Sequence, residues 1–168
     1  MILTQENPLL RQIAQEVDNF KTQELKELVA QMLKIMENKH GVGLAAPQIG
    51  ISKRIMVYGF EFNPRYPDAK PVSKNYIINP QILLESPEQD DFEEGCLSVP
   101  NTRGIVSRAK HIRYSGFDID GNNFEKEASG FEARIILHEL DHLNGVLFID
   151  KASSLTTKTL EIEKINNL

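Results

Sequence analysis

The residues best suited to chemistry are two histidines in the segment His138-Glu139-Leu140-Asp141-His142. On an α-helix, positions i and i+4 lie on one face with their Cβ atoms about 5–6 Å apart. Two imidazole nitrogens at that separation can bind one metal ion, and Glu139 can then act on a water molecule without being a ligand. This pattern is typical of metal-assisted hydrolysis. The alternative interpretation is a chance pentapeptide on an amphipathic helix whose histidines face water.

The sequence around this segment predicts a helix that begins near Ser129. Ser129 and Glu132 have the spacing of a capping box, and Asn144-Gly145 can end a helix in a left-handed conformation. Because the residues between these ends are largely apolar, most of the helix circumference is expected to be buried. Asp141 would then orient a buried group, such as Arg134 or a histidine, or face water.

A third metal ligand is needed, and Cys96 is the candidate that the chemistry favours. It is the only cysteine, and it lies in the segment EGCLS (residues 94–98), where Gly95 permits close backbone approach. One thiolate and two imidazoles leave a fourth position open, as in catalytic metal sites. The alternatives are that Cys96 only packs as a small hydrophobic residue, or that His40 or His111 takes its place as ligand.

A third segment, GVGLAAPQIG (residues 41–50), is rich in small residues and indicates backbone that another molecule approaches closely. It lacks the pattern of a phosphate-binding loop. Gly41 fits the end of a preceding helix. Gln48 is different, because a side-chain amide after such a loop can donate a hydrogen bond to a developing oxyanion.

Together, the three segments resemble the peptide deformylase family, which carries G-x-G-x-A-A-x-Q, E-G-C-L-S and H-E-x-D-H in this order. All three motifs are intact here, and the resemblance extends from Asn7-Pro8-Leu9-Leu10 to Leu147-Phe148-Ile149-Asp150. It implies a metal-dependent hydrolase that removes the formyl group from the N-terminal methionine of nascent chains and releases formate. It also implies Fe(II) as the native metal, with Ni(II), Co(II) or Zn(II) able to substitute.

The resemblance implies a role for each matching residue. Cys96, His138 and His142 would bind the metal, Glu139 would move protons, and the Gln48 amide and the Leu97 backbone N–H would stabilise the oxyanion. Arg103 is expected to pair with Glu94 and so to fix the strand that presents Cys96. A pocket for the methionine is expected beside the metal, with these substrate-binding residues: Val42, Gly43, Gly95, Phe131, Arg134 and Ile135.

Composition is consistent with a single domain over residues 1–168. The apolar fraction is 40%, the charged fraction is 26%, and the net charge of −5 argues against sequence-specific nucleic-acid binding. A single cysteine fits a reducing compartment, no apolar run is long enough for a membrane helix, and the N-terminus lacks the pattern of a signal peptide. A cytoplasmic protein without membrane contact is therefore expected, and the resemblance implies that it meets the ribosome transiently.

The chain reads as an α+β protein with antiparallel sheets packed around a central metal-binding helix. Helices are predicted from Asn7 to about Val17, from Thr22 to Gly41, and in the tail from about Ser154. Strands are predicted at residues 55–58, 76–78 and 81–84. Residues 111–117 and 124–128 are expected to form a hairpin around Asp120-Gly121.

Two other functions remain open from the sequence. A zincin-like endopeptidase could use the same helix, but its expected ligands are three histidines, or two histidines and a glutamate. A binding module in which the metal only stabilises the fold would not need Glu139. Hydrolysis of a formylated peptide, compared with its unformylated counterpart, separates these possibilities.

Overall fold

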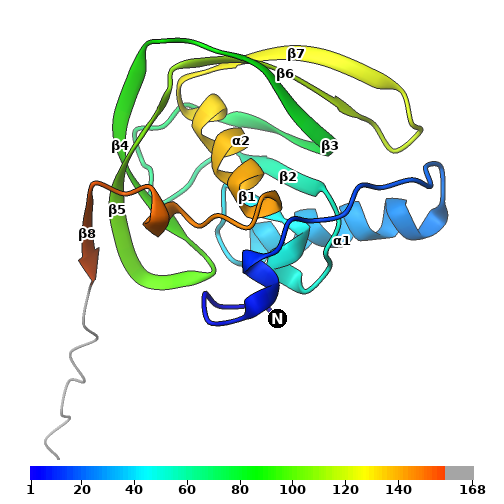
Figure 1. The fold of residues 1–168 in the computed structure, drawn as a ribbon, viewed down its shortest axis with the longest axis horizontal. Helices are drawn as coiled ribbons and strands as arrows, with labels where there is room; N and C mark the ends of the chain where they lie inside the picture. Colours follow the sequence, from blue (N-terminus) through cyan, green and yellow to red (C-terminus); the bar gives the residue numbers. More distant parts are fainter. Residues whose placement is uncertain (158–168) are drawn as a thin grey trace, which may run out of the picture.

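The computed structural model describes residues 1–157, which form the predicted α+β fold (Figure 1). The two α-helices are α1 (Gln23–Asn38) and α2 (Gly130–Leu143). The strands are β1 (Gly43–Ala45), β2 (Ile55–Phe60), β3 (Val72–Glu85), β4 (Gln89–Cys96), β5 (Val99–Ala109), β6 (His111–Phe117), β7 (Asn123–Ser129) and β8 (Ser154–Thr157). Short 3₁₀ helices are η1 (Pro8–Arg11), η2 (Ala46–Ile49) and η3 (Phe148–Asp150).

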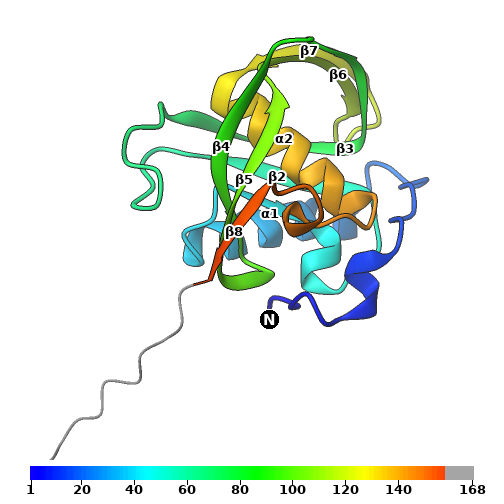
Figure 2. The same ribbon diagram turned by 60° about the vertical axis from the view of Figure 1, so that its left-hand side comes forward.

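The strands form two antiparallel sheets with α2 between them. The larger sheet has the order β1-β2-β3-β6-β7, and the smaller has the order β4-β5-β8. In two views, α2 runs through the middle of the molecule, with β4 and β5 on one side and β1 and β2 on the other (Figures 1 and 2). The sheets and the central helix therefore have the arrangement that the sequence predicted.

The larger sheet is buried on both faces near β1 and β2, because α1 and α2 pack on opposite sides. Side chains alternate along a strand. Leu44 and Val57 pack in the cluster that contains α1, whereas Ala45 and Met56 pack in the cluster that contains α2. This alternation places β1 directly beside the helix that carries the two histidines.

Helix α2 begins where β7 ends, but not with the predicted capping box. Ser129 has an extended backbone and pairs with His111 in the sheet, and its side chain makes no capping hydrogen bond. The C-terminal prediction is confirmed, because Gly145 is left-handed, with φ of 74°. The helix therefore carries His138, Glu139 and His142 in its last two turns.

Several local predictions need correction. The N-terminal helix stops at Arg11, because the backbone of Ala14 and Gln15 bonds to Leu143 and Ser52 instead. The strands predicted at 76–78 and 81–84 are one strand, β3, interrupted at Asn79, where φ is 49°.

The tail prediction is wrong for residues 154–157, which form β8 on the edge of β5, and the remainder of that prediction lies outside the described residues. The long strands β4 and β5, which present the cysteine segment, had not been predicted. Other predictions are confirmed: Asn7 and Thr22 cap η1 and α1, and residues 111–117 and 123–129 form the β6–β7 hairpin.

No helix within the described residues combines the length and the apolar character that crossing a membrane requires.

Candidate metal centre

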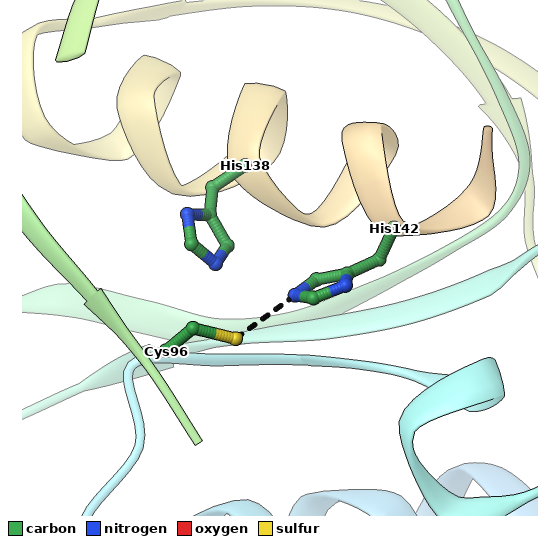
Figure 3. A group of neighbouring side chains, drawn as sticks. All are labelled: Cys96, His138 and His142. Atoms are coloured by element: carbon green, nitrogen blue, oxygen red, sulfur yellow. Dashed lines mark hydrogen bonds between the residues drawn. The ribbon is translucent and has the colours of Figure 1, made fainter. Parts of the chain in front are cut away.

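Cys96, His138 and His142 lie together at the centre of the molecule. One potential ligand atom from each residue lies within 4.8 Å of those of the other two. The histidines extend from the same face of α2, and Cys96 approaches them from the end of β4 (Figure 3). The Cys96 Sγ atom is 3.2 Å from the His142 Nε2 atom. The i, i+4 spacing on a helix therefore produces the convergence that the sequence predicted.

The two alternative ligands are not part of this group. His111 is exposed on β6 and lines a different cavity, together with Arg113 and Glu132. His40 lines the pocket beside Cys96, but it does not belong to the cluster of possible ligands in the described part of the chain. Cys96 is consequently the third donor that the geometry offers.

Glu94 fixes the orientation of His138. Its Oε2 atom is 2.8 Å from the His138 Nδ1 atom, which leaves the Nε2 side of the ring directed toward Cys96 and His142. A carboxylate behind a ligating histidine typically sets the tautomer and makes the imidazole a stronger donor. Glu94, the first residue of the EGCLS motif, thus orients one of the three candidate ligands.

Glu94 is in turn held by two buried arginines. Arg108 donates from Nε to Oε1 over 2.6 Å and from Nη2 to Oε2 over 2.9 Å, and Arg134 donates from Nη1 to Oε1 over 2.8 Å. The Arg108 Nη1 atom also donates to Asp141 over 2.9 Å, and Lys151 donates to the other Asp141 oxygen. Asp141 therefore orients Arg108, whereas the sequence analysis had suggested Arg134 or a histidine as its partner.

The predicted ion pair between Arg103 and Glu94 is wrong. Arg103 is paired with Gly95 across the hairpin, and Glu94 is paired with Gly104. Because side chains alternate between the faces of a sheet, Arg103 shares a face with Glu93, to which it donates over 3.1 Å, while Glu94 shares a face with Arg108. Arg108 is the structural partner that the sequence analysis missed, and recognition of the β4–β5 hairpin would have found it.

Glu139 lies beside the three candidate ligands, and its position depends on a glycine. A Cβ atom on Gly43 would lie 2.3 Å from the Glu139 Oε1 atom, so any other residue at this point of β1 would force the Glu139 side chain to move. The Glu139 carboxylate is buried, and its Oε2 atom has no hydrogen-bond partner among the described residues. An unpartnered buried carboxylate oxygen beside a donor cluster is suited to a reacting molecule.

Gln48 is held with its amide nitrogen toward Cys96. Its Oε1 atom accepts a hydrogen bond from the Ala45 backbone over 2.8 Å, which fixes the orientation of the amide. The Nε2 atom then lies 3.1 Å from the Ser98 hydroxyl oxygen and 3.5 Å from the Cys96 sulfur. η2 and β1 together place the buried Gln48 N–H donor beside Cys96.

The protein environment favours a thiolate at Cys96. Burial would raise the pKa of the thiol, but His142 and His138 hold it well below its ordinary value. Burial likewise opposes the charged form of His138, but Cys96 and Glu94 raise the pKa of this ring above its ordinary value. Glu139 behaves differently, because burial raises its pKa to about 7. The thiolate is the form of cysteine that binds metals.

These donors fit a divalent transition metal. A thiolate sulfur and two imidazole nitrogens converge, and the remaining side faces a pocket rather than a fourth side chain. Three protein ligands with an open position characterise catalytic sites, whereas structural sites usually have four ligands.

The pocket has an empty volume of about 530 Å³, which includes its opening to solvent. It contains Glu139, Gln48 and Leu97, and the residues that the resemblance placed around the substrate also line it: Val42, Gly43, Gly95, Phe131, Arg134 and Ile135. Residues that the sequence analysis had not included are Phe92 and, from the loop after β2, Arg65 and Tyr66. Arg134 lines the wall while its guanidinium is bound to Glu94.

Comparison with known proteins identifies the class to which this fold and site belong. The model of the polypeptide deformylase family matches residues 1–158. Peptide deformylase 1 of Bordetella pertussis is 47% identical over 155 residues, which cover 92% of this chain and 88% of the relative.

Solved structures agree with this match. The crystal structure of class I type b peptide deformylase from Acinetobacter baumannii bound to Met-Ala-Ser has a TM-score of 0.87 and 40% identity, and the match covers 90% of this chain and 96% of that one. Peptide deformylase from Thermotoga maritima has a TM-score of 0.82 and 38% identity, with 92% and 97% covered.

The chain therefore belongs to the polypeptide deformylase family. It is a hydrolase of the kind that removes N-formyl groups from the N-terminal methionine of nascent polypeptides, and its family depends on a metal.

Proposed function

We propose that Cys96, His138 and His142 bind one divalent metal, natively Fe(II), and that the whole of residues 1–168 is one catalytic domain built around it. The observation that carries this assignment is the convergence of one sulfur and two nitrogen donors beside the open pocket. The resemblance to the family supports iron, with Ni(II), Co(II) or Zn(II) as substitutes. When bound, the cation would act as a Lewis acid on the formyl oxygen and would activate water as the nucleophile.

The protein's own residues would then handle protons and negative charge. Glu139 would accept a proton from the attacking water and return it to the amine that leaves, because an unprotonated amine leaves poorly. General-base assistance of this kind contributes on the order of 10²–10⁴-fold. The raised pKa of Glu139, about 7, matches such a role near neutral pH.

Gln48 and Leu97 would stabilise the tetrahedral oxyanion. The Gln48 Nε2 donor is fixed beside Cys96, and Leu97 follows the cysteine in the same pocket. Preorganised donors avoid the cost of reorganisation during the reaction, and loss of one such donor costs about 2.7–4 kcal/mol.

The substrate would be a formylmethionyl peptide whose first side chain enters the pocket between α2 and β1. Val42, Phe131 and Ile135 supply apolar surface there, and Gly43 and Gly95 allow the peptide backbone to come close. Met-Ala-Ser bound to the Acinetobacter baumannii relative supports this choice of substrate. Because such substrates emerge from ribosomes, we place the enzyme in the cytoplasm in transient contact with the ribosome, without membrane or sequence-specific nucleic-acid binding.

The test is formate release from formyl-Met-Ala-Ser by nickel-loaded protein, with the unformylated peptide assayed in parallel. Nickel prevents oxidation of the metal from being mistaken for inactivity. We expect formate from the first peptide and no peptide-bond cleavage in either. No formate from protein that holds one metal per chain would refute the assignment, and cleavage of the unformylated peptide would favour the endopeptidase.

Two variants separate catalysis from stabilisation of the fold. Glu139→Gln should keep the metal and lose turnover by at least about 10²-fold. Glu132→Gln is the matched control on the same helix, because Glu132 lines the other cavity and does not line the pocket at the metal centre. Equal activity of the two variants would contradict the role given to Glu139.

A further inference from the structure

The loop between β2 and β3 carries an arginine to the mouth of the pocket. Arg65 is exposed, and it lines the pocket at the metal centre together with Gly95, Cys96 and Leu97. It also lines the adjoining groove along the start of β5, which shares these three residues and continues to Arg103. Arg65 therefore lies where the pocket opens into the groove.

Loops are commonly mobile, but this one is held in place at its start. The Asn63 side chain is buried, donates to the His40 carbonyl over 2.9 Å, and accepts from the Arg65 backbone N–H over 2.9 Å. The Tyr66 backbone N–H donates to the Asn63 carbonyl over 3.0 Å. Pro64 and Pro67 further restrict the backbone on either side.

Tyr66, the next residue, anchors the loop on the rest of the site. The centroid of its ring lies 4.9 Å from the ring centroid of Phe131 and 6.0 Å from that of Phe92. The Arg103 guanidinium lies 5.1 Å above the same ring. Arg65 is consequently presented from a fixed backbone, which lowers the entropic cost of an interaction with a ligand.

The charges around the mouth leave Arg65 without a partner. Arg103 forms an ion pair with Glu93, and Arg134 forms one with Glu94. Arg65 makes no ion pair within 4 Å among residues 1–157, although Asp68 and Glu93 line the same surface hollow. The mouth of the pocket thus presents one arginine that forms no ion pair among the described residues, in a chain whose net charge is −5.

We propose that Arg65 is a specificity-determining residue that favours formylated peptides with an acidic side chain at the second or third position. This inference rests on the proposed function. With the formyl group at the metal centre and the methionine side chain inside the pocket, the following residues must leave through the mouth. An extended peptide advances about 3.3 Å per residue, so the second and third positions would lie near the mouth, which Arg65 lines.

The expected effect is modest, because Arg65 is exposed. Exposed ion pairs contribute about two- to fivefold to an equilibrium. The pair would form in the bound peptide and persist in the transition state, so the gain should appear as a lower KM with kcat nearly unchanged. It should fade in 1 M salt, where the Debye length is about 3 Å.

The experiment measures kcat/KM of the nickel-loaded full-length enzyme for blocked peptides that differ in one side chain. Formyl-Met-Glu-Ala-Ser-amide and formyl-Met-Ala-Glu-Ser-amide are each compared with their Gln and Lys counterparts. At one or both positions, we expect kcat/KM for the Glu peptide to exceed that for its Gln counterpart by two- to fivefold. The Lys peptide should have the lowest kcat/KM of the three. Comparison within a pair cancels differences in metal loading.

Two variants assign the preference to Arg65. Arg65→Gln should bring the Glu-to-Gln ratio to about one, and Arg65→Glu should reverse the order so that the Lys peptide is best. Arg113→Gln is the matched control, because Arg113 is an exposed arginine that lines the cavity beside His111, and it should keep the wild-type ratio.

Equal kcat/KM for Glu and Gln peptides at both positions would overturn the inference, as would an acidic preference that survives in Arg65→Glu. Failure of the proposed function looks different, because no peptide, including the uncharged Gln peptides, would then release formate. That result would overturn the proposed function and this inference with it.

Discussion

Replacement of Glu94 by Gln should destabilise the protein far more than the same change at its neighbour Glu93. Glu94 is buried and accepts hydrogen bonds from Arg108 and Arg134 while it orients His138. Removal of one partner from a buried charge network typically costs about 3–5 kcal/mol, because the remaining charges stay buried without compensation. In a chain of this size, that corresponds to a fall in Tm of about 6–20 °C.

Glu93→Gln is a matched control on the opposite face of the same strand. The Glu93 side chain is 53% exposed and forms a single ion pair with Arg103. Exposed pairs contribute about 0.2–1 kcal/mol, so this variant should unfold at nearly the wild-type urea concentration. Both variants should be measured with a chelator present, because bound metal adds its own stabilisation and would hide the difference.

The stability lost in Glu94→Gln should depend on pH in a defined direction. Burial alone would raise the pKa of Glu94, but hydrogen bonds from Arg108 and His138 hold it well below its ordinary value of 4.5. A group whose pKa is lowered by folding stabilises the native state above its unfolded pKa and loses that contribution as pH falls. The difference in free energy of unfolding between wild type and Glu94→Gln should therefore be largest above about pH 4.5 and should become smaller at lower pH.

The result that would refute this reasoning is equal destabilisation by Glu94→Gln and Glu93→Gln. A gap that widens as pH falls would also contradict it. With metal present, Glu94→Gln should in addition lower metal affinity by about 10–100-fold, because the support behind His138 is weakened. Competition with a chromogenic chelator would measure this change.

Three further predictions concern the centre itself. Gly43→Ala should keep the metal but lower kcat on the order of 10²-fold, because the added methyl group displaces Glu139; full activity in a metal-replete variant would contradict this. Burial raises the pKa of Glu139 to about 7, and a bound cation would lower it. The acid limb of the pH profile of kcat/KM should therefore have its midpoint at or below about pH 7. A midpoint clearly above pH 7 would argue against Glu139 as the base. Cobalt-loaded Cys96→Ser should lose sulfur-to-metal charge-transfer absorption while His40→Gln retains it, and an unchanged spectrum in Cys96→Ser would exclude the thiolate as ligand.

The sequence by itself identified the candidate metal ligands and predicted the central helix. His138 and His142 converge because a helix places i and i+4 on one face, which is a local property of the chain. The proposed donors Cys96 and Gln48 could also be recognised, because each lies in a short segment whose composition is unusual. The antiparallel α+β arrangement followed from the order and the patterning of the segments.

Only the tertiary structure decided how the centre is supported. The identity of the Glu94 partner depends on the register of the β4–β5 hairpin, which pairs residues up to 20 positions apart, as with Gln89 and Ala109, and a shift of one residue would exchange the faces. Sequence reasoning selected Arg103, whereas the alternation of side chains brings Arg108 to Glu94 and directs Arg103 to Glu93.

The residues that line the mouth of the pocket could likewise not be predicted from local sequence patterns. The loop with Arg65 and Tyr66 lies between β2 and β3 in the chain, and nothing in its composition indicates that it reaches the metal pocket. It does so because Tyr66 packs on Phe92 and Phe131, which come from β4 and α2. Local spacing could identify the proposed ligands because they share a helix face or a motif, whereas contacts between distant strands and loops depend on packing that the full fold alone defines.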